Sequence, residues 1–377
     1  MRRFFLLMLL AVIMSVSFYA HPSYSEDNYL QPVSADLQKE HLNGNNDSAY
    51  VREIPGAGIS RNKVTPSDSY YDMRQDPNRG GGNFVTGVKN QNSYNTSWAF
   101  AAMGAIESNY LIQSGKTLDL SEMYLAYFSL LNPDKSKAFA NVSSFSDAMN
   151  HGGNAFYAAA LFSRLDGPVL ESDFPYSQTA PSKSSPESYK RVLRVRDALS
   201  LRVATTTDEN LLYGFTVNAG DSSRTSAKAR ILQFGGIVAA YYDDDNDYKK
   251  TASNGTSFYS TTRNYNPDGS PNTSKTPNRD VLLVGWDDNY SRTNFKTQPP
   301  MDGAWLAKNS RGTSWGDNGY FWISYNNYLR DGTSFVVEEV SPDMKAYYYD
   351  ALGACSAWGW QTLPLYAANV FKAERGR

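Results

Sequence analysis

Histidine and cysteine, the residues that most often supply a neutral-pH base or a thiolate nucleophile, are scarce in this sequence. The 377 residues contain three histidines, His21, His41 and His151, and a single cysteine, Cys355. One cysteine can form neither a disulfide within the chain nor a cysteine-based metal site. Because histidine is the side chain whose ordinary pKa lies closest to neutrality, general base catalysis has few candidate residues here.

An acidic run, Asp243-Asp244-Asp245-Asn246-Asp247, carries oxygen ligands of the kind that bind calcium. It lacks the spacing and the glycine of an EF-hand loop. We therefore interpret the run as a solvated surface loop, and we predict neither a metal site nor a cofactor.

The composition favours a folded chain rather than a disordered one. Hydrophobic residues make up 41% of the sequence and aromatic residues 14%, which is enough for a packed core. The formal net charge of −2 gives no electrostatic basis for binding nucleic acid or an anionic membrane surface.

The first 25 residues are typical of a signal peptide. Arg2 and Arg3 precede an apolar run over residues 4–16, and small and polar residues follow. The run is shorter than the roughly 20 apolar residues that span a bilayer, so we predict no transmembrane domain. A retained membrane anchor is the alternative. Cleavage after Ser25, or after Ala20, would release a protein that is secreted, periplasmic or held at the cell surface.

Helical periodicity follows a polar N-terminal stretch. Residues 26–65 show weak periodicity and many turn-forming residues, which predicts a linker or a pro-segment. Apolar residues at helical spacing predict a helix from about Ser97 to Gln113, ended by Ser114-Gly115 and buried on most sides. Further helices are expected to begin at Ser121 and to cover 155–165, so that the chain is largely helical up to about residue 200.

The second half of the chain has a different pattern. Short apolar or aromatic runs between turn signals predict strands at 235–242, 281–286 and 319–325. Helices first and strands afterwards favour an α+β fold with two lobes.

Four segments resemble the active-site motifs of papain-like (C1) cysteine peptidases, in the family's order. Residues 88–100 resemble the segment of the catalytic cysteine. They read Val-Lys-Asn-Gln and then, after five residues, Ser-Trp-Ala-Phe. His151-Gly152-Gly153 resembles the Gly-Gly substrate strand. Residues 278–286 resemble the histidine segment, and 308–320 resemble the asparagine segment. Four ordered motifs are far more specific than one.

The resemblance covers roughly residues 66–340, with supporting matches at 120–122 and 167–176. It implies a papain-like fold with a helical left lobe, a β-rich right lobe and an active-site cleft between them. The peptidase domain is expected at 66–345. The tail, 346–377, resembles the start of the lectin-like extension that prokaryotic members usually carry, here truncated.

Carried over residue by residue, the resemblance implies a site whose catalytic residues are substituted. Gln91 stands at the oxyanion-hole position and Asn309 at the position that orients the histidine, but Ser97 stands at the nucleophile position and Arg279 at the histidine position. A serine hydroxyl needs a positioned base as it attacks. Arginine is always charged and has no lone pair to accept a proton, so it cannot be that base. Losing nucleophile and base together typically costs on the order of 10⁶-fold in rate.

Three further positions bear on ligand binding. Arg311 replaces the tryptophan that, in the family, shields the histidine–asparagine hydrogen bond from water. Arg279 and Arg311 would repel one another unless an anion or a carboxylate lies between them. Gly152 and Gly153 stand at substrate-binding positions.

Several residues have more than one interpretation. Asn92 and Asn95 replace family glycines, and asparagine is among the better non-glycine residues for positive φ. His151 could serve as a substitute base, although a surface or subsite residue is the simpler interpretation. Cys355 lies outside every motif and is expected to be a buried or free thiol.

Three functional hypotheses follow. The favoured one is an inactive pseudo-peptidase that binds a peptide, a protein or another ligand in the cleft, since activity must be argued from the site and not from the fold. The second is an active hydrolase that uses Ser97 with an unorthodox base. The third is a decayed, truncated product without a function.

Overall fold

The computed structural model describes residues 64–130, 144–177, 179, 186–201, 222–251, 255–261 and 277–340. All of them belong to one unit of the chain, 31–353 with 368–377. The predicted signal peptide, almost all of the predicted linker or pro-segment, the C-terminal extension and Cys355 lie outside the described residues.

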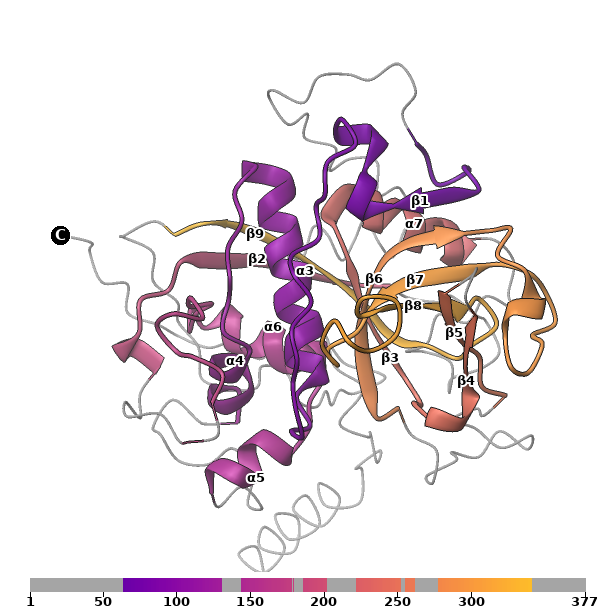
Figure 1. Ribbon diagram of the computed structural model, residues 1–377. Coiled ribbons are helices and arrows are strands. Elements are labelled where there is room, and N and C mark those ends of the chain that lie inside the picture. The colour runs from indigo at the N-terminus through magenta and orange to yellow at the C-terminus, as the bar shows by residue number, and fades with distance from the viewer. Residues whose placement is uncertain are drawn as a thin grey trace, which may run out of the picture. The chain divides into compact units, whose positions relative to one another are not determined.

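Helix α3 (Ser97–Ser114) is the central element of the fold (Figure 1). Nearly all of its side chains are buried, as its apolar residues on every face predict. The helix ends where Gly115 takes a left-handed φ of 68° and its N–H donates to the carbonyl of Leu111. The predicted end of this helix is therefore confirmed. Gly104 allows close approach to the sheet, because a Cβ there would lie 3.2 Å from a methyl group of Leu282.

The other helices are short. They are α4 (Glu122–Phe128), α5 (Phe145–Asn150), α6 (Ala155–Ser163) and α7 (Ser222–Phe234), with 3₁₀ turns η2 (Met73–Gln75), η3 (Pro77–Arg79), η4 (Pro186–Ser188), η6 (Asp245–Asp247) and η7 (Arg292–Asn294). Ser121 begins α4 as predicted, since its side chain accepts a hydrogen bond from the Tyr124 N–H. Helix α6 ends two residues earlier than predicted because Leu165 has a φ of 63°, which a right-handed helix cannot contain.

The described strands form one mixed sheet in the order β2-β9-β3-β6-β7-β8-β5-β4, and β1 pairs with β6. Their bounds are β1 (Tyr70–Asp72), β2 (Leu193–Ser200), β3 (Ile237–Tyr241), β4 (Tyr248–Thr251), β5 (Gly255–Phe258), β6 (Arg279–Asp287), β7 (Ala304–Lys308), β8 (Tyr320–Ser324) and β9 (Arg330–Glu339). The pairs are antiparallel except for β5 with β8, which is parallel.

The three predicted strands correspond to β3, β6 and β8. Strands β3 and β8 start later than predicted because Gly235 and Gly319 have positive φ values, and β6 extends beyond its predicted range at both ends. The prediction that the chain is largely helical up to residue 200 is wrong, since β2 lies in that region. A bulge between Val195 and Asp197 breaks the alternation of buried residues in β2, so that its period of two is hidden in the sequence.

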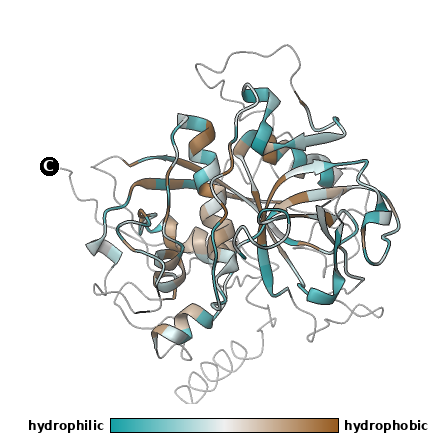
Figure 2. Cartoon of the chain, in the orientation of Figure 1, coloured by the Kyte–Doolittle hydropathy of each residue, from teal (hydrophilic) through white to brown (hydrophobic). Residues whose placement is uncertain are grey.

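The predicted α+β two-lobe fold is confirmed. In Figure 1, α3 runs between the helices α4, α5 and α6 on the left and the strands β4 to β8 on the right. Figure 2 shows hydrophobic residues gathering on α6 and on the strands beside α3, and hydrophilic ones on β1. Within the described part of the chain, we find no helix with the length and apolar character that crossing a membrane requires.

Candidate active site

Ser97 is the first residue of α3, and it faces the start of β6. Its hydroxyl oxygen accepts a hydrogen bond of 3.1 Å from the backbone N–H of Asp280. The side chain lies at the positive end of the helix dipole and is only 6% exposed. The helix that carries the predicted nucleophile position is thus tied directly to the strand that carries the predicted histidine position.

Arg279 is the first residue of β6, where it pairs in register with Tyr241 of β3. Its Nη1 donates to Oε1 of Gln91 over 3.2 Å, and its Nε donates to Oδ2 of Asp243. Both contacts use the guanidinium as a donor, which is the only role open to it.

Gln91 is held by three side-chain hydrogen bonds. Its Oε1 accepts from Arg279 and, over 2.5 Å, from the hydroxyl of Ser310. Its Nε2 donates to the carbonyl of Tyr94 over 2.6 Å. Because Arg279 and Ser310 donate at one end of the amide and the carbonyl of Tyr94 accepts at the other, the positions of the amide oxygen and nitrogen are fixed. Sequence reasoning missed Ser310, although it directly follows Asn309.

Asn309 follows β7 and is buried, 3% exposed. Its Oδ1 accepts from the N–H of Ser310 over 2.8 Å, and its Nδ2 has no hydrogen-bond partner among the described residues. None of the hydrogen bonds described for this region joins Asn309 to Arg279. The structure therefore brings Gln91, Ser97 and Arg279 together through β6 and connects Asn309 to them through Ser310.

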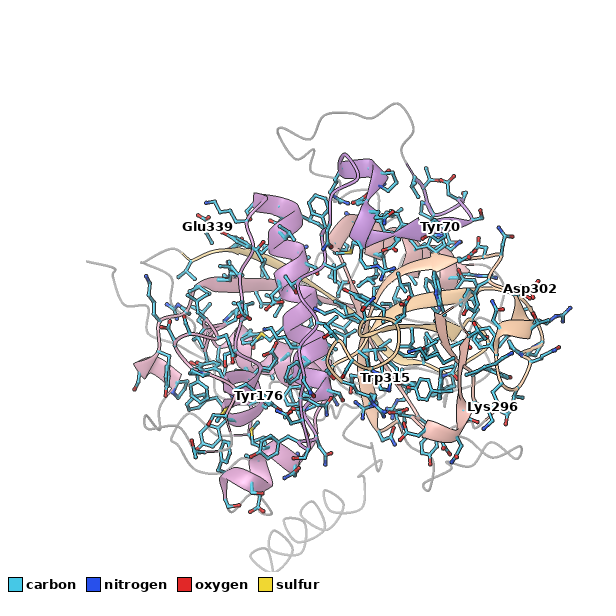
Figure 3. The ribbon with its side chains drawn as sticks, in the orientation of Figure 1. Tyr70, Tyr176, Lys296, Asp302, Trp315 and Glu339 are labelled. Carbon is cyan, nitrogen blue, oxygen red and sulfur yellow. The ribbon has the colours of Figure 1, made fainter. Side chains whose placement is uncertain are left out.

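Arg311 lies on the same side of the site. Its Nη2 donates to Oδ2 of Asp243 over 2.6 Å, and its Nη1 donates to Oδ1 of Asp245 over 2.8 Å. Its guanidinium lies 5.3 Å from the ring centre of Trp315. Partial burial alone would lower the pKa of Arg311, but the charge of Asp243 and the hydrogen bond to Asp245 outweigh it and raise that pKa. In Figure 3, Trp315 lies to the right of the first turn of α3 and Tyr176 to its left.

Asp243 corrects the interpretation of the acidic run as a solvated loop. Its side chain is 5% exposed and accepts from both arginines at one oxygen, whereas Asp245 is 77% exposed. The sequence analysis expected Arg279 and Arg311 to repel unless an anion or a carboxylate lay between them, and the group that lies between them is the carboxylate of Asp243. Among the described residues, no group of histidine, cysteine, aspartate and glutamate side chains could hold a metal ion.

The predicted substrate glycines lie after α5. A Cβ on Gly153 would fall inside the indole of Trp98, whereas a Cβ on Gly152 would meet nothing within 4 Å. Gly152 has a φ of 82°, and Nδ1 of His151 lies 3.3 Å from its carbonyl oxygen. Asn92 has a φ of 54°, as its replacement of a glycine predicts.

A cavity of about 10 Å³, the space of one water, lies behind the site. Asp280, Asn309 and Ser310 line it together with buried charges. Nζ of Lys89 contacts Oε1 of Glu122 at 2.7 Å and Oε1 of Glu107 at 3.3 Å.

Lys308 lines the same cavity, and burial shifts the pKa values of both Glu122 and Lys308. Burial raises the pKa of Glu122 to about 8, against the lowering effect of Lys89, and lowers the pKa of Lys308.

Residues 68–340 match the family model described as papain family cysteine protease. The chain belongs to this family. Curated relatives of this papain-family chain are named as proteases. The viral cathepsin of Heliothis zea nuclear polyhedrosis virus is 26% identical over 257 residues, 68% of this chain and 52% of the viral protein. Cathepsin L2 of Homo sapiens is 27% identical over 241 residues, 64% of this chain and 58% of the human protein. The chain thus spans little more than half the length of these relatives.

Two solved structures of Cwp84 show the same fold as this papain-family chain. One, described as the clostridial cysteine protease after propeptide cleavage, is 25% identical with a TM-score of 0.53 and covers 72% of this chain and 60% of that one. The other holds the cysteine protease and lectin-like domains of Cwp84 of Clostridium difficile. It is 24% identical with a TM-score of 0.54, and covers 85% of this chain and 64% of that one.

Proposed function

We propose that this chain is an exported pseudo-peptidase, which binds a peptide segment beside Ser97 and does not hydrolyse it. The observation that carries the proposal is the side chain of Arg279, whose guanidinium donates to Gln91 and Asp243 where a proton acceptor would be needed.

The chemistry of Ser97 supports inactivity. Its hydroxyl oxygen accepts from a backbone N–H, and attack on a carbonyl also requires a base that removes its proton. A guanidinium cannot take a proton at any pH that leaves the protein folded. The helix dipole assists an anion at this position, but without a base it does not generate one.

The glycine pair supports retained peptide binding. Gly153 packs on the ring of Trp98, which fixes the backbone of this segment. Gly152 has open space where a side chain would be, so an extended peptide backbone can approach it closely. Main-chain hydrogen bonds of this kind do not depend on a nucleophile or a base.

The N-terminal sequence supports the export part of the proposal. Arg2, Arg3 and the apolar run over 4–16 have the pattern of a signal peptide, which would direct the protein out of the cytoplasm. The lone cysteine, which needs no oxidising compartment for folding, is compatible with either side of the membrane.

Hydrolysis by Ser97 with an unorthodox base is the second candidate, because the relatives are named as proteases. A turnover assay separates the two. The purified chain is incubated with casein and fluorogenic dipeptides between pH 5 and pH 8, and with an epoxide that alkylates thiolates. We expect no cleavage and no covalent adduct at Ser97. Cleavage that disappears in Ser97→Ala would establish the second candidate instead.

Peptide binding is tested separately by selecting peptides from a displayed library and measuring fluorescence anisotropy. Gly152→Leu should abolish binding by filling the open space. Gly81→Leu is the matched control, since Gly81 also has a positive φ (78°) and nothing within 4 Å of its Cβ position, but lies in the loop that follows η3. Equal loss in both variants, or no saturable peptide at all, would refute the proposal and leave the decayed product.

A further inference from the structure

Asp243 occupies the space between two arginines that come from separate segments. Arg279 begins β6 and Arg311 follows β7, yet Nε of the first and Nη2 of the second both donate to Oδ2 of Asp243. The side chains of Arg279, Arg311 and Asp243 are all mostly buried. Without the carboxylate of Asp243, the two guanidinium groups would face one another with no anion between them, and Asp245 would pair with Arg311 alone.

The backbone of Asp243 is fixed in place as well. Its N–H donates to Oδ1 of Asn278 over 2.7 Å, and its carbonyl accepts from Nδ2 of Asn278 over 3.2 Å. Asn278 directly precedes Arg279, so the residue that anchors the aspartate adjoins one of the arginines that the aspartate binds. The carboxylate is therefore held at this position by its main chain and by its charge.

Two tyrosines also lie beside Asp243, and they add no charge. Burial, and then the charge of Asp243, raise the pKa of Tyr241, and burial raises that of Tyr248, so both phenols stay neutral. The second oxygen of Asp243, Oδ1, has no hydrogen-bond partner among the described residues. The carboxylate is therefore held by its main chain and by the two arginines, and Tyr248 interacts with it as well.

Two guanidinium groups that converge on one oxygen form an anion-binding geometry. We propose that Asp243 is an internal anion, which fills a two-arginine anion site beside Gln91 and makes the site reject anionic ligands. Arg279 and Arg311 are matched by Asp243 and Asp245, so the site is balanced in charge. If the proposed peptide binding holds, on which this part rests, the bound segment carries no acidic side chain at this point.

The test removes the internal anion and offers an external one. Asp243→Asn keeps the shape of the side chain, and inorganic phosphate is the probe, measured by isothermal titration calorimetry and by the shift in melting temperature. We expect phosphate to bind Asp243→Asn at least about tenfold more tightly than it binds the unchanged protein, because the variant has one net positive charge and an open position between the two guanidinium groups, whereas Arg311 keeps only Asp245 as a partner.

Two controls isolate the position of the charge. Asp247→Asn removes a carboxylate from the same loop, one that pairs with neither arginine among the described ion pairs, and should bind phosphate no better than the unchanged protein. Asp243→Glu keeps the charge and should also show no gain. Phosphate binding of equal strength in all four proteins, or in none, overturns the proposal.

Asp243→Asn is expected to be less stable, so its folding is part of the test. If it does not fold in chloride buffer, refolding yields are compared with and without phosphate. A yield that phosphate raises in this variant alone supports the internal anion, and a yield that phosphate does not change refutes it. Neither result depends on peptide binding, so the proposed function can fail while this inference stands.

Discussion

Nη1 of Arg279 donates a hydrogen bond to Oε1 of Gln91 across 188 positions of sequence. A guanidinium at this place engages the amide oxygen as a donor, whereas a base would have to accept a proton. The contact joins the start of β6 to the loop before α3, so Arg279, which cannot act as a base, still links two segments that are distant in sequence. Removing Arg279 should therefore affect stability as well as any binding.

The ion-pair network predicts non-additive stability changes. Asp243→Asn should lower the free energy of unfolding by about 3 kcal/mol, because it leaves two mostly buried arginines without their shared partner. Arg279→Gln should cost less, since Asp243 keeps Arg311. The double variant should lose clearly less than the sum of the two. Urea unfolding measures all three, with Asp247→Asn as the control. Strict additivity would show that the two side chains do not interact.

Restoring activity requires changes at two positions together. Ser97→Cys supplies a thiol but no acid for the leaving amine, and Arg279→His supplies that acid. We expect peptidase activity on fluorogenic dipeptides only when both are present, with strong non-additivity.

Adding Arg311→Trp would shelter the imidazole, but it removes the second cation from Asp243. We therefore expect the triple variant to need Asp243→Asn to remain folded, which circular dichroism can check. A folded but inert set of variants would mean that the site geometry no longer supports hydrolysis.

The two neighbouring glycines should respond differently to alanine. Gly153→Ala places a methyl group inside the Trp98 indole and should destabilise the protein by about 1–3 kcal/mol through overpacking. Gly152→Ala meets open space, so its cost is limited to the left-handed backbone, about 1 kcal/mol. Melting temperatures should thus fall further for Gly153→Ala. The reverse order would contradict the packing of this segment on Trp98.

Glu122 predicts a pH dependence of stability. Its pKa is about 8 in the folded protein against an ordinary value of 4.5, so folding favours the protonated form. The contribution of Glu122 to the free energy of unfolding is fully present below pH 4.5 and is lost as the pH rises toward 8. Between these values the free energy of unfolding falls by up to about 1 kcal/mol per pH unit.

Glu122→Gln should remove this slope, measured as urea unfolding at several pH values. Asp119→Asn takes an exposed carboxylate from the same lysine and should keep the slope, because Glu122 is still present. A slope that survives in Glu122→Gln would assign it to another group.

The sequence predicted α3, its end at Gly115 and the three buried strands, because each is a local apolar pattern between turn signals. It also singled out Gln91, Ser97 and Arg279, which the structure brings together. It could not predict that Asp243 joins them. The end of β3 and the start of β6 are adjacent only through strand pairing, which no local pattern reveals. Strand β2 was missed for a related reason, since it is defined by its pairing with β9.

The cluster of Lys89, Glu107 and Glu122 has a consequence for how such a chain can evolve. Replacing Lys89 leaves the buried carboxyl groups of Glu107 and Glu122 without their shared cation, which costs about 3–5 kcal/mol, a large part of what a marginally stable domain can lose. Lys89 is therefore difficult to replace alone, whereas the fold already accommodates a serine at position 97 and an arginine at position 279. In a lineage without selection for hydrolysis, substitutions would therefore accumulate at positions 97 and 279 before they accumulated at Lys89.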